Sequence, residues 1–123
     1  MGAGTTAEAA GVAFAERRAA PRYRCAGAAE IVVPGHGLHY AARIVDLSAA
    51  GCFLETDCRL ERGSSVEIWL HVEDLGLPLR LRAHLLARRG NGAGFRFQDV
   101  SARKAEQIGW LTAELARRAA AQE

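Results

Sequence analysis

The sequence predicts an all-β domain, a six-stranded antiparallel β-barrel with an α-helix at its C-terminal end. Two observations lead to this expectation. Six short segments rich in apolar residues follow one another between residues 28 and 98, joined by short turns and with no helical pattern between them. After residue 99 the apolar residues recur at helical spacing instead. An antiparallel sheet of six short strands buries its inner face and removes its edges when it closes into a barrel.

The length and composition fit a single ordinary domain. The chain has 123 residues, of which 50% are hydrophobic and 24% charged, and this balance argues against a wholly disordered protein. The formal net charge is only +2, so an electropositive site has to come from local clustering of charge. The sequence has no run of about 18 apolar residues and no secretory pattern at its start, so we expect a cytoplasmic protein without membrane insertion.

The six predicted strands differ in the clarity of their patterns. The two clearest are 65–72 and 77–86, where apolar residues occupy every second position. At Asn91-Gly92 we expect positive φ in a hairpin turn that folds the last strand back onto the preceding one. The full set of predicted strands is 28–33, 38–47, 52–55, 65–72, 77–86 and 93–98.

The predicted C-terminal helix covers residues 101–118. Ser101 suits the N-cap position, because its hydroxyl can accept a hydrogen bond from a backbone N–H of the first turn. Trp110 projects about opposite the apolar stripe, and we expect it to lie against the barrel rim, with a contact surface as the alternative. The stripe itself consists of Ala105, Ile108, Leu111 and Leu115.

The N-terminal residues, the cysteines and the histidines indicate no catalytic or metal chemistry. Residues 1–15 are rich in Ala, Gly and Thr and bury too little surface to fold alone, so we expect a flexible tail. Cys25, Cys52 and Cys58 are odd in number and lack metal-ligand spacing, and we interpret them as buried apolar residues. No nucleophile and base stand in a recognisable arrangement, so we expect no metal, no cofactor and no enzymatic activity.

Four arginines fall within eight residues of the segment 16–24, which we call the arginine arm. Pro21 lacks an amide donor and disfavours a helical conformation at Ala20, so we expect an extended or turning arm. A guanidinium is planar, permanently charged and forked. It therefore suits paired acceptors such as a phosphate or the O6/N7 edge of guanine. Taken alone, the cluster is more typical of a solvated basic linker than of a binding site.

A second motif, D-x-S-x-x-G, lies between the second and third predicted strands at Asp46, Ser48 and Gly51. The Asp46 carboxylate can accept the N1–H and N2–H groups of guanine, and Ser48 can donate to a phosphate or accept from an amino group. Gly51 permits positive φ and the close approach of a ligand to the backbone. These residue types also occur in ordinary turns, so the motif alone is weak support for a binding site.

The combination of these features resembles the PilZ domain family. It joins Arg18-x-x-x-Arg22 to D-x-S-x-x-G about 25 residues later, and adds Gly92-Ala93-Gly94-Phe95-Arg96-Phe97 and a closing helix. The resemblance implies a stand-alone PilZ-like barrel that binds the second messenger cyclic di-GMP. The implied organisation is a flexible tail at 1–15 and a PilZ-like domain at 16–118, comprising the arm at 16–24, the barrel at 25–98 and the helix at 101–118. The implied ligand-binding residues are Arg17, Arg18, Arg22, Asp46, Ser48 and Gly51.

Four functions remain to be weighed from the sequence. The first is a receptor in which the arm wraps over cyclic di-GMP and the changed surface engages an unidentified protein effector. The second is a ligand-independent interaction module of motility or secretion that uses faces such as Trp69, Arg80 and Trp110. A DNA- or RNA-binding barrel is disfavoured by the low net charge and by the lack of interleaved exposed aromatics. An enzyme is the least expected.

Arg17 bears on the number of ligands. It gives the arm one more planar cation than a single cyclic di-GMP needs, so a second ligand molecule stacked into the first is expected. The alternative is that Arg17 points into solvent and one ligand binds.

Overall fold

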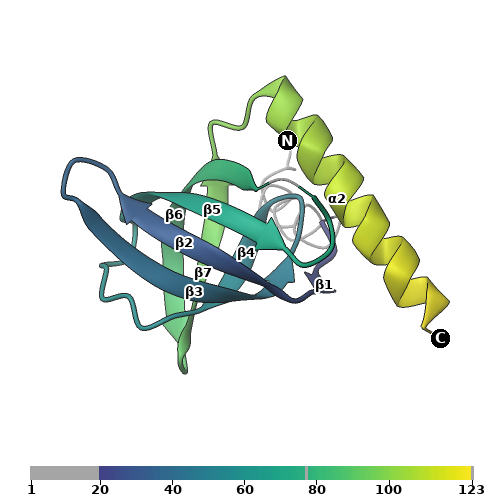
Figure 1. The fold of residues 1–123 in the computed structure, drawn as a ribbon. Helices are drawn as coiled ribbons and strands as arrows, with labels where there is room; N and C mark the ends of the chain where they lie inside the picture. Colours follow the sequence, from purple (N-terminus) through teal and green to yellow (C-terminus); the bar gives the residue numbers. More distant parts are fainter. Residues whose placement is uncertain (1–19, 77, 123) are drawn as a thin grey trace, which may run out of the picture.

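The computed structural model describes residues 20–76 and 78–122, and within these ranges the chain forms seven strands and one helix. The two residues of β1 precede the barrel, six longer strands form it, and the helix follows (Figure 1). The elements are β1 (Tyr23–Arg24), β2 (Gly27–Val33), β3 (Leu38–Leu47), β4 (Gly51–Glu55), β5 (Ser65–Val72), β6 (Leu79–Arg89), β7 (Gly92–Gln98) and α2 (Ala102–Ala121).

The six longer strands form one closed antiparallel barrel, as the sequence predicted. Neighbouring strands follow the order β3-β2-β5-β6-β7-β4, and β4 pairs again with β3 to close the sheet. Consecutive strands pair for the most part with one another, which is why short turns suffice to connect them. The segment 65–72 is a strand over the predicted bounds, and β6 continues to Arg89, three residues beyond the prediction.

The seventh strand, β1, was not predicted. Tyr23 pairs with Leu47 and Arg24 pairs with Asp46, so the end of the arginine arm joins the edge of β3. The arm is therefore extended at Tyr23 and Arg24, as expected, and nothing in the sequence indicated that these two residues pair with the barrel. A strand of two residues is too short to show a sequence period, which explains why the pattern did not indicate it.

The core fills the barrel and extends beneath α2. Every second residue of β5 is buried, which is the period-2 pattern of a strand with one face inward. The helix contacts β1 and β6 beside one end of the barrel (Figure 1). Its buried residues are Ile108, Leu111 and Leu115, each contributing about 1.5–3 kcal/mol by burial. Ala105, which we expected on this stripe, is exposed.

The helix begins and ends close to the predicted residues. The Ser101 side chain accepts a hydrogen bond from the backbone N–H of Lys104 at 3.2 Å, so the predicted N-cap is confirmed. The helix continues to Ala121, three residues beyond the predicted end. Across the described ranges, no helix combines the length and the apolar character needed to span a membrane.

The turn between β6 and β7 differs from the prediction in one detail. Arg89 pairs with Gly92, so Gly90 and Asn91 are the two loop residues and Gly92 already belongs to β7. Positive φ occurs at Gly90, with a value of 61°, and not at Asn91 or Gly92. Glycine at the first loop position is the arrangement of a type II′ hairpin turn, which matches the twist of the flanking strands.

The three cysteines are free thiols in the described chain. Cys52 and Cys58 are buried, as predicted, whereas Cys25 is half-buried at the end of the arm. Among residues 20–76 and 78–122, no group of three or more His, Cys, Asp or Glu side chains is placed to hold a metal ion.

Candidate functional site

The pairing of β1 with β3 brings the arginine arm to the D-x-S-x-x-G motif. Arg24 lies opposite Asp46 in the register, and the Nη1 atom of Arg22 lies 4.0 Å from the Asp46 Oδ2 atom. The Arg22 side chain is 64% exposed, so it can still offer N–H donors outward, whereas Asp46 is 18% exposed. One exposed guanidinium and one partly covered carboxylate thus lie side by side on the outer surface of the barrel.

Ser48 holds the turn between β3 and β4. Its Oγ atom accepts hydrogen bonds from the backbone N–H groups of Ala50 and Gly51, both at 3.1 Å. The hydroxyl also donates to the Gly51 carbonyl oxygen at 3.3 Å, and the residue is 6% exposed. The hydroxyl is therefore directed at the backbone of its own turn, as serine commonly is in such loops. A contact between Ser48 and a ligand phosphate stays a prediction.

Gly51 is needed for close packing and not for an unusual φ. It lies in β4 opposite Arg96, and its φ is not positive, so the expectation of positive φ is wrong. A Cβ atom at this position would lie 2.1 Å from the carbonyl oxygen of Phe95. The close approach that requires glycine here is that of β7, whose backbone at Phe95 and Arg96 lies against Gly51 in the paired strands.

A small cavity of about 110 Å³ connects Arg22 with the Ser48–Gly51 turn, and Asp46 is not among the residues that line it. Arg22, Ser48 and Gly51 line it together with Arg96, an exposed residue of β7. Ligand pockets commonly have volumes of about 300–1,000 Å³, so a dinucleotide seated here would extend over the outer surface. Sequence reasoning did not name Arg96 as a site residue. Its outward position between the buried Phe95 and Phe97 was the available signal.

A second hollow lies on the helix side of β1. It has a volume of about 430 Å³ and is lined by Arg22, Arg24, Leu115 and Arg118, among others. Arg22 therefore borders both hollows, and β1 lies between the candidate site and α2. A change in the position of β1 would alter its contact with the helix.

Two predicted site residues, Arg17 and Arg18, lie outside the described residues. The expected tail at 1–15 and the first part of the arm, 16–19, lie outside them as well. The structure thus brings together Arg22, Asp46, Ser48 and Gly51, and the roles of Arg17 and Arg18, including the number of ligands, stay predictions.

Cys25, which follows the arm, has an altered pKa. Burial raises the pKa of its thiol to about 11, and the negative charge of Asp46 contributes to the same shift. Burial also raises the pKa of Cys52, with smaller contributions from Asp46 and Cys25. The thiols beside the candidate site therefore stay protonated and unreactive at neutral pH.

We expect stability to fall less steeply at alkaline pH in Cys25→Ala than in the unsubstituted chain. The unfolded chain ionises this thiol near a pKa of 9.0, whereas the folded chain holds the proton up to about 11. The contribution to stability is thus complete below pH 9 and is lost as the pH rises toward 11. Because Cys25 is half-buried, the difference between the two chains should be below about 1 kcal/mol. Urea denaturation at about pH 8 and pH 10 measures it, and identical losses in both chains would contradict this assignment.

Comparisons with known proteins agree with this geometry. A family model described as "PilZ domain" matches residues 16–114. No curated protein sequence matches the chain. Among solved structures, the "PilZ domain with c-di-GMP of YcgR from Escherichia coli" is 19% identical with a TM-score of 0.67, covering 86% of this chain and 96% of that one.

Two further structures share the fold. "YcgR in complex with c-di-GMP from Escherichia coli" has a TM-score of 0.74 at 21% identity and covers 86% of this chain, which spans 49% of that longer protein. The "PilZ domain of CeSA from cellulose synthesizing bacterium" has a TM-score of 0.64 at 14% identity, covering 78% of this chain and 98% of that one. At these identities the likeness shows a common fold.

Proposed function

The chain belongs to the PilZ domain family, and from this premise we propose that it is a non-enzymatic receptor for cyclic di-GMP that signals to a protein partner. The ligand would lie on the outer surface of the barrel, over the cavity between the arginine arm and the D-x-S-x-x-G turn. The main support is the position of Arg22 beside Asp46, 4.0 Å apart across the β1–β3 pair.

The chemistry of the ligand matches these two groups. Cyclic di-GMP carries two anionic phosphates and two guanines, each with a Watson–Crick edge and an acceptor edge. The Arg22 fork suits a phosphate or the O6/N7 edge, and the Asp46 carboxylate suits the N1–H and N2–H donors. Arg18 and Arg17 would supply further cations. Guanidinium planes can also stack on guanine, and base stacking onto side chains contributes about 1–3 kcal/mol per base.

Signalling would pass through β1 to the helix. Tyr23 of β1 packs against the core, Arg22 immediately before β1 lines the candidate site, and β1 contacts α2. A ligand that draws the arm toward the barrel would therefore shift the contact between β1 and α2. This differential contact is what a receptor needs to change the surface that a partner meets.

A second candidate function, a ligand-independent interaction module, is favoured by one observation. The Arg80 guanidinium lies 4.1 Å from the centroid of the Trp69 ring, and Trp110 is 59% exposed on the neighbouring helix. Exposed aromatic and arginine side chains are enriched at protein interfaces. Absence of cyclic di-GMP binding, with partner binding retained, would favour this alternative.

Calorimetric titration with cyclic di-GMP tests the proposal, with cyclic di-AMP as the control ligand. We expect Asp46→Ala to lose about 1.5–3 kcal/mol of binding free energy for cyclic di-GMP, because a carboxylate that pairs with the guanine edge is removed. The preference of this variant for cyclic di-GMP over cyclic di-AMP should fall as well. Added salt, in contrast, should weaken the phosphate contacts equally in the variant and in the unsubstituted chain.

Asp57→Ala provides the matched control, since Asp57 is exposed after β4 and lies away from the arm pairing. It should bind cyclic di-GMP as the unsubstituted chain does. Unchanged binding by Asp46→Ala with a lowered melting temperature would identify Asp46 as a turn former instead.

A further inference from the structure

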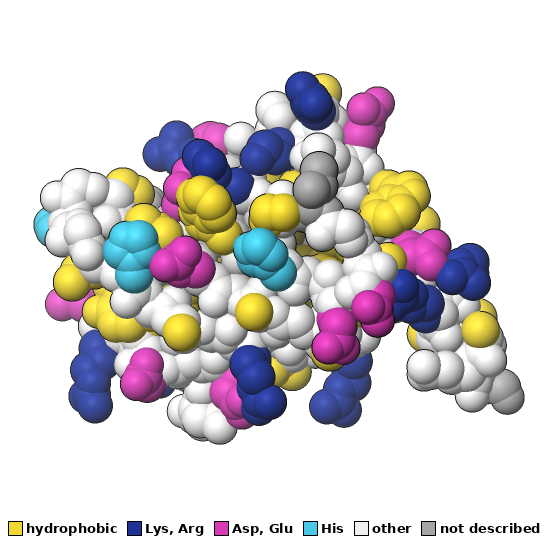
Figure 2. Space-filling view, in the orientation of Figure 1, with side chains coloured by type: hydrophobic (Ala, Val, Ile, Leu, Met, Phe, Trp, Pro, Cys, Tyr) yellow, Lys and Arg dark blue, Asp and Glu magenta, His cyan; other side chains and the backbone are white. Residues whose placement is uncertain are grey.

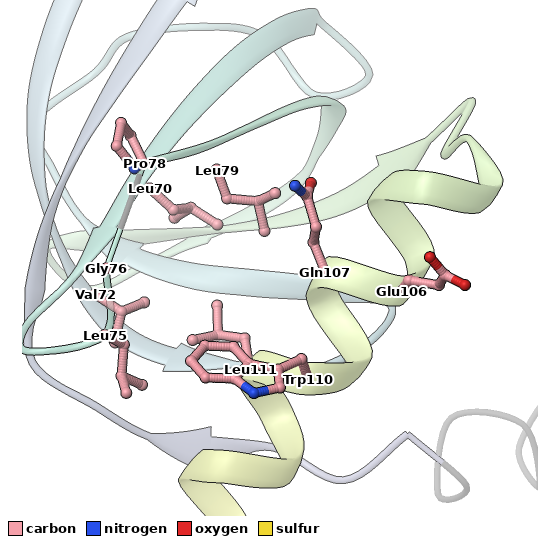
Figure 3. Close-up of a pocket in the computed structure, with 10 residues that line it drawn as sticks. All are labelled: Leu70, Val72, Leu75, Gly76, Pro78, Leu79, Glu106, Gln107, Trp110 and Leu111. Carbon is pink, nitrogen blue, oxygen red and sulfur yellow. The ribbon is translucent and has the colours of Figure 1, made fainter.

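A large apolar groove lies between α2 and the end of the barrel, separate from the candidate ligand site. Its volume is about 430 Å³. Leu70, Val72 and Leu79 form the barrel side, and Leu111 and Trp110 form the helix side, with all these side chains directed into the space between the two elements (Figure 3). Trp110 is 59% exposed, so a large aromatic ring borders an open apolar surface. Trp110 borders the end of the barrel, where we expected it, but its ring is largely exposed, and its membership of a contact surface stays a prediction.

Another hollow, distinct from the one beside β1, continues this groove onto the outer face of β5 and β6. Its volume is about 390 Å³, and it shares Pro78, Leu79 and Gln107 with the apolar groove. Its outer part is formed by Trp69 and Arg80, whose stacked contact fixes the aromatic ring in place. Together the two hollows form one surface, which we call the tryptophan groove.

The tryptophan groove has a basic rim. Arg80, Arg103 and Lys104 line its outer part, and within the described ranges none of the three lies within 4.0 Å of a carboxylate oxygen. Two carboxylates also belong to this surface: Glu106 of the helix lines the groove, and Glu67 accepts a hydrogen bond from Trp69 Nε1 at 3.2 Å. Figure 2 shows Lys and Arg side chains beside hydrophobic ones along the upper edge of the molecule, over β5 and the start of α2.

We propose that the tryptophan groove docks an amphipathic acidic helix of a protein partner, with apolar side chains in the groove and Asp or Glu side chains against Arg80, Arg103 and Lys104. Such a helix presents apolar anchors at i, i+3 or i+4, and i+7, which is how grooves beside helices are commonly filled. The proposal rests on the proposed function only in requiring a protein partner, and it does not require cyclic di-GMP to bind.

The charge pattern argues for this occupant over two others. A symmetric contact with a second copy of the chain would bring two identical basic patches into one interface, where like charges repel. A nucleic acid would find three cations beside a broad apolar surface, whereas its backbone requires a polar, positively charged one. An acidic amphipathic segment satisfies both the apolar floor and the basic rim.

The test uses intrinsic fluorescence, because both tryptophans of the chain border the groove. The probe is a synthetic helical peptide of about 16 residues, free of Trp and Tyr, with Leu at the anchor positions and Glu beside them. Titrated into the full chain, it should shift the tryptophan emission to shorter wavelength in a saturable, salt-sensitive manner. A peptide with Lys in place of Glu, and one with the same acidic composition in scrambled order, should each bind at least about tenfold more weakly.

Substitutions locate the binding surface. Trp110→Ala should weaken binding of the acidic peptide by about tenfold or more, and the emission of Trp69 measures the binding in this variant. Because the Trp110 side chain is exposed, we expect the variant to fold. Arg103→Glu combined with Lys104→Glu should reverse the preference toward the Lys peptide. Arg62→Glu is the matched control, since this exposed residue lies in the loop before β5, away from the groove, and should leave binding unchanged.

Three outcomes would overturn the proposal. Equal binding of the acidic and basic peptides, or undetectable binding of both, excludes an acidic partner helix. Self-association of the free chain in sedimentation, abolished by Trp110→Ala, would make a second copy the occupant. A change of tryptophan emission on Phe14→Ser without peptide would make the N-terminal segment of the same chain the occupant. Cyclic di-GMP titration of Trp110→Ala separates the two hypotheses, because the ligand site and the groove can each fail while the other is retained.

Discussion

Arg22→Ala is expected to remove most of the affinity for cyclic di-GMP while leaving the fold intact. The guanidinium is 64% exposed and lines the small cavity of the candidate site, so it offers charge and hydrogen bonds to a ligand but fills no core volume. Loss of hydrogen bonds to a charged group costs about 1.5–3 kcal/mol, which corresponds to a roughly 10- to 150-fold weaker affinity. Calorimetric titration measures the affinity, and thermal unfolding measures the stability.

The stability of Arg22→Ala should change by less than about 1 kcal/mol, because its contact with Asp46 is long and solvent-exposed. Arg18→Ala is expected to weaken binding to a similar degree. Arg62→Ala serves as the control, since it removes an exposed arginine from the loop before β5. If Arg22→Ala and Arg18→Ala both kept the affinity of the unsubstituted chain, the arm would not belong to the site.

The barrel was predictable from the sequence because its strands have one buried and one exposed face. Alternation in 65–72 gives both the bounds and the inward face of β5. Local patterns carried less information where tertiary contacts decide the outcome. The two residues of β1 form a strand only because β3 offers an edge to pair with, and Ala105 is exposed although its helical spacing matches that of the buried stripe.

The candidate site was predictable in its residue types and not in its geometry. The resemblance pointed to Arg22 and Asp46, but their proximity depends on the pairing of Arg24 with Asp46 across two strands. The motif residues Ser48 and Gly51 were read as ligand contacts, and the structure gives both of them roles within the barrel as well. Such roles follow from which backbone atoms lie nearby, and a single sequence does not specify that.

Gly51→Ala is expected to be the most destabilising substitution in the motif. The added Cβ atom would lie 2.1 Å from the Phe95 carbonyl oxygen, so β4 and β7 would have to separate at their paired residues Gly51 and Arg96. Overpacking of this kind commonly costs about 1–3 kcal/mol, and a clash with backbone places the expected loss at about 3 kcal/mol. The shift would also displace Arg96 and the Ser48 turn, so binding of cyclic di-GMP should weaken as well.

Gly94→Ala separates this steric effect from the general effect of replacing a strand glycine. Gly94 lies on the same pair of strands, opposite Phe53, but a Cβ atom there would meet its nearest neighbour at 3.7 Å, an ordinary contact distance. Gly94→Ala should therefore change the free energy of unfolding by less than about 1 kcal/mol, or raise it slightly by restricting the unfolded chain. Urea denaturation of both variants gives the comparison. Similar stabilities would mean that β4 and β7 can separate at Gly51 at little cost, and the glycine of the motif would then be better explained by a ligand that approaches its backbone.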